Sequence, residues 1–200
     1  SLAAWNDEEW VFGGGGSGTP GVGTSSFNVQ QDTWSGPAAP TVATGSFADF
    51  EQNPGDDLEF VVDPSAMTPG DDIYAPVALT TEASSVAGTL TLQAPVPAVG
   101  HSADDPQGLL WENLTYSVRA TTDATVAADC SAGSFATSGT VVAEDLTLAD
   151  PLSASPQSLS AARGNVQYYC FRISLPDSAA TQGLQGRSVY PAWRFAAVSE

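Results

Sequence analysis

The chain has 200 residues, a formal net charge of −18 at pH 7 and a sequence pI near 4.1. Its 5 basic residues are all arginines scattered along the chain, so they cannot form the basic patch that binding to a phosphate backbone requires. No apolar run approaches the roughly 18 residues of a membrane-spanning helix. The 42% of hydrophobic residues suffices for the core of one soluble, folded domain.

An apolar segment opens the chain, and a glycine-rich one follows it. Ser1–Phe12 contains Trp5, Trp10 and Phe12, while Gly13–Gly23 has the composition of a flexible linker. Because each tryptophan has on the order of 200 Å² to bury, we expect the first segment to dock on a sheet. Two ways of docking stay open. The segment either becomes an edge strand of its own domain or pairs with the next molecule as a donor strand.

Alternation of apolar and polar residues, bounded by Gly, Pro, Asp and Ser, predicts β-strands along the rest of the chain. The predicted strands lie at residues 27–31, 73–79, 89–93, 114–120, 166–173 and 189–198. Within 166–173, the alternation places Tyr169, Phe171 and Ile173 on one face and Tyr168 and Cys170 on the other. The strand number, about eight to ten, suits an all-β, two-sheet jelly-roll-type β-sandwich. Helix is expected only in short pieces, at 156–163 and 178–182.

The two cysteines, Cys130 and Cys170, predict a disulfide, with two buried free thiols as the alternative. The first residue is Ser1, which suggests a processed N-terminus. Together these features predict a secreted protein. Asn113 opens a glycosylation sequon, whose use the sequence does not decide.

No constellation of residues supports catalysis. His101 is the only histidine and lies in a loop-like context, so it is interpreted as an ordinary surface residue. A Ser-His-Asp triad is not supported, because no Gly-x-Ser-x-Gly nucleophile elbow occurs on a strand-to-helix turn. A single histidine cannot form a two-histidine zinc motif. The chain is therefore predicted not to be an enzyme. An extracellular metal-dependent hydrolase stays as the weakest alternative.

Acidic residues cluster in the expected turns and near the N-terminus. Oxygen-rich loops suit calcium, so the weak calcium candidates are Asp56, Asp57, Asp71 and Asp72. The more ordinary interpretation is that such pairs, like Asp7-Glu8-Glu9, are solvated, and no cofactor is expected. Any self-association must overcome like-charge repulsion and should be favoured by salt or divalent ions. The absence of lysine excludes covalent isopeptide assembly.

Several short motifs occur in an order that resembles the TasA/camelysin family. They are Leu2-Ala3-Ala4-Trp5-Asn6-Asp7, Thr24-Ser25-Ser26-Phe27-Asn28-Val29, Pro69-Gly70-Asp71-Asp72-Ile73, Ala87-Gly88-Thr89-Leu90-Thr91-Leu92, and the run from Val166 through Leu184-Gln185-Gly186 to Phe195. The chain departs from the family pattern in its long glycine stretch, in its second Pro-Gly-Asp-Asp turn at 54–57 and in its cysteine pair.

This resemblance implies a secreted jelly-roll protein that polymerises into surface or biofilm-matrix filaments. Each subunit would insert an N-terminal donor strand into the sheet of the next, and the partner would be a second copy of the chain. The implied division is 1–12 donor strand, 13–23 hinge and 24–200 sandwich domain. The donor residues would be Leu2, Ala4, Trp5, Trp10, Val11 and Phe12, with Gly13, Gly14, Gly15 and Gly16 in the hinge. The alternative is a monomeric cell-surface module that binds a glycan or a protein in a groove lined by aromatic residues.

Overall fold

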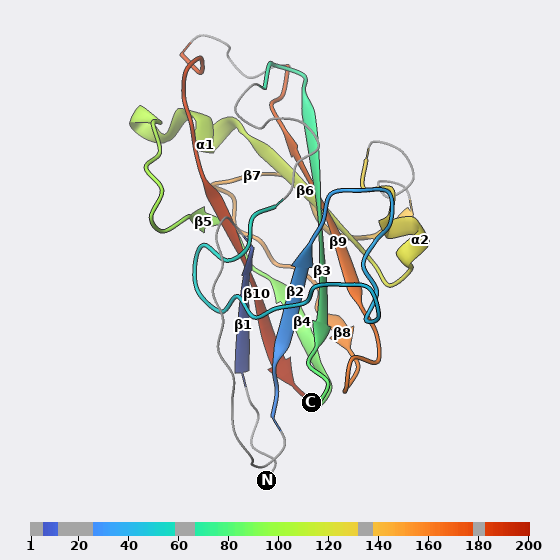
Figure 1. Cartoon of the computed structure of the whole chain (residues 1–200). Helices are drawn as coiled ribbons and strands as arrows, with labels where there is room; N and C mark the ends of the chain where they lie inside the picture. Colours follow the sequence, from blue (N-terminus) through green and yellow to red (C-terminus); the bar gives the residue numbers. More distant parts are fainter. Residues whose placement is uncertain (1–5, 12–25, 59–66, 132–137, 178–182) are drawn as a thin grey trace.

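Two antiparallel β-sheets face each other across an apolar core (Figure 1). The computed structural model describes residues 6–11, 26–58, 67–131, 138–177 and 183–200. The first sheet contains, in spatial order, β1 (Asn6–Val11), β10 (Pro191–Ser199), β4 (Gly88–Leu92) and β8 (Gln157–Leu159), with β5 (Val96–Pro97) also paired to β10. The second sheet contains β2 (Val29–Thr33), β3 (Asp72–Thr81), β9 (Gln167–Ser174), β6 (Thr115–Thr121) and β7 (Thr140–Thr147). The predicted all-β, two-sheet sandwich is confirmed.

The predicted alternation places the core between the sheets. Strands of the second sheet present Ile73, Ala75, Val77 and Leu79 from β3, Tyr116, Val118 and Ala120 from β6, and Tyr169, Phe171 and Ile173 from β9. Strands of the first sheet present Leu90 and Leu92 from β4, and Trp193, Phe195 and Ala197 from β10. The aromatic rings meet across the layer. The Trp193 ring lies 5.0 Å from that of Phe171, and the Phe195 ring lies 4.6 Å from that of Tyr169.

A second, smaller cluster covers the outer face of the second sheet. Tyr168 and Cys170 point outward from β9, as predicted, and pack with Ala78 of β3 and with Ala127. The Tyr168 hydroxyl donates to the carbonyl of Pro40 at 2.7 Å, so the loop around residue 40 is held over this face. β9 is therefore buried on both sides, which accounts for its nearly continuous run of large side chains.

The helices are short: η2 (Pro106–Gly108), α1 (Leu109–Asn113) and α2 (Ala124–Ala127). The expected helix at 156–163 is wrong. The chain there forms β8 against β4, and the Asn165 side chain accepts from the Ser160 amide and donates to the Ser158 carbonyl. The expected helix at 178–182 lies outside the described residues. In the described part of the chain, no helix has the length and apolar character needed to cross a membrane.

Candidate functional site

β1 lies in a slot at one side of the sandwich. It pairs antiparallel with β10, from Asn6 opposite Val198 to Val11 opposite Trp193 (Figure 1). On its other side, the Trp10 amide donates to the Phe50 carbonyl at 3.1 Å. β1 therefore contacts backbone on both flanks, and it joins the last strand of the chain to the loop that follows β2.

Two hydrogen bonds from β2 hold β1 in this position. The Gln31 amide group donates to the Trp10 carbonyl at 2.5 Å, and the Val29 backbone amide donates to the Asp7 carboxylate at 2.8 Å. β2 is an edge strand of the second sheet, and β1 is an edge strand of the first. β1 thus bridges the edges of both sheets and closes the core on this side.

The outer face of β1 carries Glu8 and Trp10. Both contact Arg194 of β10, whose guanidinium bonds the Glu8 carboxylate at 2.6 Å and lies 5.8 Å from the centroid of the Trp10 ring. Glu8 and Arg194 are partly exposed, so this ion pair contributes little stability, on the order of 0–1 kcal/mol. Trp10, expected as an apolar anchor, lies on this outer face and is only half-buried.

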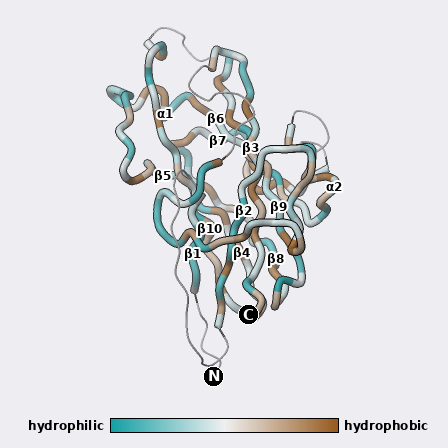
Figure 2. The backbone as a smooth tube through the Cα atoms, viewed as in Figure 1, coloured by the Kyte–Doolittle hydropathy of each residue, from teal (hydrophilic) through white to brown (hydrophobic). Residues whose placement is uncertain are grey.

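The inner face of β1 is acidic, and Figure 2 shows hydrophilic colours along the strand. Glu9 has a solvent-exposed fraction of 0% and lies opposite Phe195, a residue of the core. One carboxyl oxygen of Glu9 accepts from the Phe50 amide at 3.3 Å, and the other has no hydrogen-bond partner among the described residues. The interpretation of this acidic stretch as solvated is therefore wrong for Glu9.

Burial raises the pKa of the two inward carboxyls, those of Asp7 and Glu9. Removal from water, reinforced by the negative charges of Asp7, Asp49 and Glu51, raises the pKa of Glu9 to about 10, against the opposing hydrogen bond from Phe50. Burial also raises the pKa of Asp7, although hydrogen bonds from the Val29 and Glu8 amides oppose that rise. Glu9 is thus neutral when β1 is docked at pH 7.

The structure describes only part of the predicted donor segment. Of its residues, Trp10 and Val11 belong to β1, whereas Leu2, Ala4, Trp5, Phe12, Gly13, Gly14, Gly15 and Gly16 lie outside the described residues. Asp7 and Glu9 were missed as inward-facing residues. The sequence shows only the grouping: alternation puts Glu8 on the face of Trp10 and Asp7 and Glu9 on the opposite one, without deciding which face enters the core.

Three of the four calcium candidates accept hydrogen bonds from other residues of the chain. Asp56 accepts from the Thr33 hydroxyl at 3.0 Å, Asp71 accepts from the Thr68 amide at 2.6 Å, and Asp72 accepts from the Ser174 hydroxyl. No group of three or more Asp, Glu, His or Cys side chains suited to a metal ion occurs in the part of the chain that the structure describes. Calcium binding at Asp56, Asp57, Asp71 and Asp72 stays a prediction.

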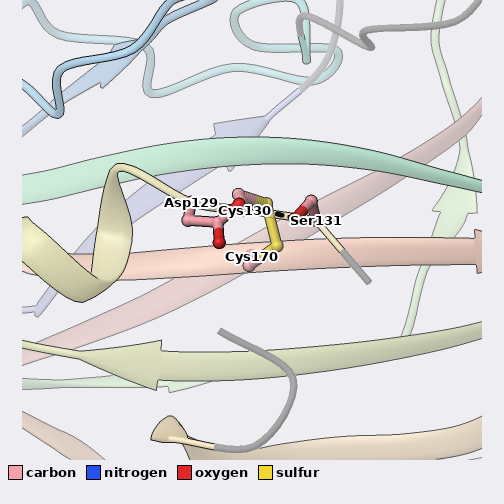
Figure 3. Close-up of a disulfide and its surroundings, with 4 residues drawn as sticks. All are labelled: Asp129, Cys130, Ser131 and Cys170. Atoms are coloured by element: carbon pink, nitrogen blue, oxygen red, sulfur yellow. Dashed lines mark hydrogen bonds between the residues drawn. A yellow bond between two sulfur atoms is a disulfide. The ribbon is translucent and has the colours of Figure 1, made fainter. Parts of the chain in front are cut away.

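Cys130 and Cys170 form the predicted disulfide, with their Cα atoms 5.5 Å apart (Figure 3). The bond ties the segment after α2 to the middle of β9. Beside it, the Ser131 hydroxyl donates to the Asp129 carboxylate at 2.6 Å (Figure 3).

A shallow groove of about 240 Å³ lies on the outer face of the second sheet. Its lining consists of Tyr74, Ser117, Arg119, Ser131, Glu144, Cys170 and Arg172. Both arginines are paired within the protein, Arg119 with Glu144 at 2.9 Å and Arg172 with Asp145. The groove is polar and contains one aromatic side chain, so it differs from the aromatic groove expected of a binding module.

His101 is placed at the surface, with its ring centroid 5.0 Å from that of Tyr190. No family model, curated protein or solved structure matches this chain.

Proposed function

We propose that this protein is the structural subunit of an extracellular filament, in which β1 of one subunit docks in the slot of the next. The observation that supports this proposal is the docking of β1 itself. A strand near the N-terminus completes a sheet by backbone pairing with β10 and by hydrogen bonds with β2. The family resemblance of the motifs points the same way, and the disulfide fits a secreted or extracellular protein.

The same slot can accept β1 from a second copy. All the β1 contacts described above are made with residues that follow it in the chain, and an identical strand from another molecule offers the same partners. Residues 12–28, which connect β1 to β2, span about 55 Å when fully extended, enough to reach a neighbouring subunit. Exchange of this strand from copy to copy produces a head-to-tail chain without any covalent link.

The state of the slot after β1 is withdrawn explains why subunits would exchange this strand. Withdrawal leaves the edge of β10 unpaired beside the buried rings of Trp193 and Phe195. An unpaired strand edge next to apolar side chains is a template for pairing with another chain. The sandwich is therefore more stable when the slot is filled, by its own β1 or by that of a neighbour.

Engineered cross-links distinguish the two modes of docking. The Trp10 amide points to Phe50, away from β10, so Trp10 and Glu8 occupy non-hydrogen-bonded positions, where opposite Cα atoms lie about 4.5 Å apart. Glu8→Cys with Ala196→Cys is therefore placed to form a disulfide across the β1–β10 pair. Glu8→Cys with Val141→Cys, on exposed β7, is the matched control that should form no such bond.

Oxidation of the Glu8→Cys/Ala196→Cys variant in concentrated protein should give a ladder of covalent oligomers on a non-reducing gel. Electron microscopy of the same samples should show filaments, which disappear when residues 1–12 are deleted. Oxidation in dilute solution should lock the strand in its own subunit and give a monomer that no longer assembles until it is reduced. Cross-linking confined to monomers at every protein concentration, with no filaments, would refute the proposal.

A monomeric binding module is the second candidate, and the groove on the second sheet is the observation that favours it. An anionic glycan or peptide would have to displace Glu144 and Asp145 from Arg119 and Arg172. Binding that is lost in Arg172→Ala and retained in the 1–12 deletion would support this function.

A further inference from the structure

We infer that docking of β1 takes up a proton at Glu9, so that the N-terminal strand is held in its slot at acidic pH and released as the pH rises. This inference goes beyond the proposed function, because it holds equally when β1 fills the slot of its own subunit or of a neighbour. Its basis is the placement of an acidic side chain where the described residues of the slot offer no positive charge.

The surroundings of Glu9 are either neutral or negative. β10 contributes Phe195 opposite it, and from β2 the neutral Gln31 bonds the carbonyl of the adjacent Trp10. The charged groups that act on Glu9 are Asp7, from β1 itself, together with Asp49 and Glu51, from the loop after β2, and all of them are acidic. The cation of β10, Arg194, is bonded to Glu8 on the other face of the strand.

The hydrogen bonds around Glu9 also favour its protonated form. An ionised carboxylate buried with one oxygen unpartnered and the other in a single 3.3 Å bond is poorly compensated. Gln31, which reaches β1 through its amide group, likewise has a buried carbonyl oxygen without a partner among the described residues. The slot therefore contains buried acceptor oxygens, on Glu9 and Gln31, that lack a hydrogen-bond donor in the described part of the chain. A protonated Glu9 carboxyl adds a donor there.

The size of the effect follows from proton linkage. The undocked carboxyl has an ordinary pKa of 4.5, and burial in the docked strand raises the pKa to about 10. Because the docked form has the higher pKa, docking is strongest below pH 4.5 and weakens with rising pH until the docked carboxyl itself ionises. Between those limits the docking equilibrium constant falls about tenfold per pH unit, so that at pH 7 it is about 300-fold below its value at low pH.

Two substitutions on neighbouring residues separate this mechanism from a general charge effect. Glu9→Gln removes the inward charge and keeps the shape of the side chain. Glu8→Gln removes the same charge one residue away, on the outer face, and is the matched control. Both variants are compared with wild type as full-length protein at low concentration, where the readout does not depend on filament formation.

Hydrogen exchange, corrected for the intrinsic effect of pH, measures docking as the protection of the amides of residues 6–11. Wild type and Glu8→Gln should lose protection by about tenfold per pH unit from pH 5 to pH 8, whereas Glu9→Gln should lose far less, keeping only the weaker pH dependence that the raised pKa of Asp7 contributes. Protection of the Phe171 amide, in β9 between β3 and β6, serves as the check that each variant is folded. In wild type, ¹³C NMR of the Glu9 carboxyl should show no ionisation near pH 4.5 while the strand stays docked.

Three results would overturn the inference. They are pH-independent protection in wild type, a pH dependence in Glu9→Gln as steep as that of wild type, and ionisation of Glu9 near pH 4.5 with β1 still docked. Failure of the filament experiments alone would leave this test unaffected, because it follows strand docking within the monomer.

Discussion

Removal of the disulfide by Cys130→Ala with Cys170→Ala should lower the free energy of unfolding by about 4 kcal/mol. The bond joins residues separated by 40 positions, and the chain-entropy model gives about 4 kcal/mol at 25 °C for a loop of that length. For a protein of this size, the loss corresponds to a fall in Tm of roughly 8–16 °C. The physical reason is that the reduced, unfolded chain gains conformations that the closed loop forbids.

Urea unfolding followed by circular dichroism measures this loss. Wild type in the presence of a reductant is the matched control, because it opens the same loop and retains both sulfur atoms. Cys170 is buried in the small cluster with Tyr168 and Ala78, so the alanine variant should be slightly less stable than the reduced wild type. A loss below about 1 kcal/mol in both samples would refute the loop-closure reasoning, and a loss in the variant alone would assign the effect to packing.

Two further substitutions test the packing between strands. Trp193→Ala should lower the free energy of unfolding, measured in urea, by about 3–5 kcal/mol, because the side chain is only 1% exposed and its ring contacts those of Tyr116 and Phe171. A loss below about 1 kcal/mol would contradict the burial of this ring in the core. Gly88→Ala should lower the free energy of unfolding by about 1–3 kcal/mol, because the new Cβ would lie 2.5 Å from the Val198 carbonyl oxygen. A thermal midpoint equal to that of wild type would contradict this close contact between β4 and β10.

The strands were the most predictable part of the fold. In β3, β6 and β9, residues of one parity are apolar and enter the core, so period-two alternation identifies them without any tertiary information. The short β8 was not predictable in this way. Gln157–Leu159 has too few residues to show a period, and its pairing with β4 is a contact between segments far apart in the sequence.

Each of the short helices α1 and α2 begins where a single aspartate side chain accepts hydrogen bonds from backbone amides. A sequence pattern gives only a weak signal for such helices. The Asp123 carboxylate caps α2 by accepting from the Thr125 and Val126 amides. The Asp105 carboxylate accepts from the Leu110 and Trp111 amides at the start of α1 and pairs with Arg187 at 2.8 Å. Because α1 and α2 contain only 5 and 4 residues, neither builds an apolar stripe that reveals a helix.

The sequence by itself determined the all-β class, the cysteine pair, and the two faces of β9, because these depend on composition and on the alternation of neighbouring residues. Only the tertiary structure decided that the segment Asn6–Val11 lies between β10 and Phe50, and that Glu9 rather than Trp10 points inward. The physical reason is that a strand in isolation has two equivalent faces. Which face enters the core is set by the register with its partner, and that register is a property of the folded chain.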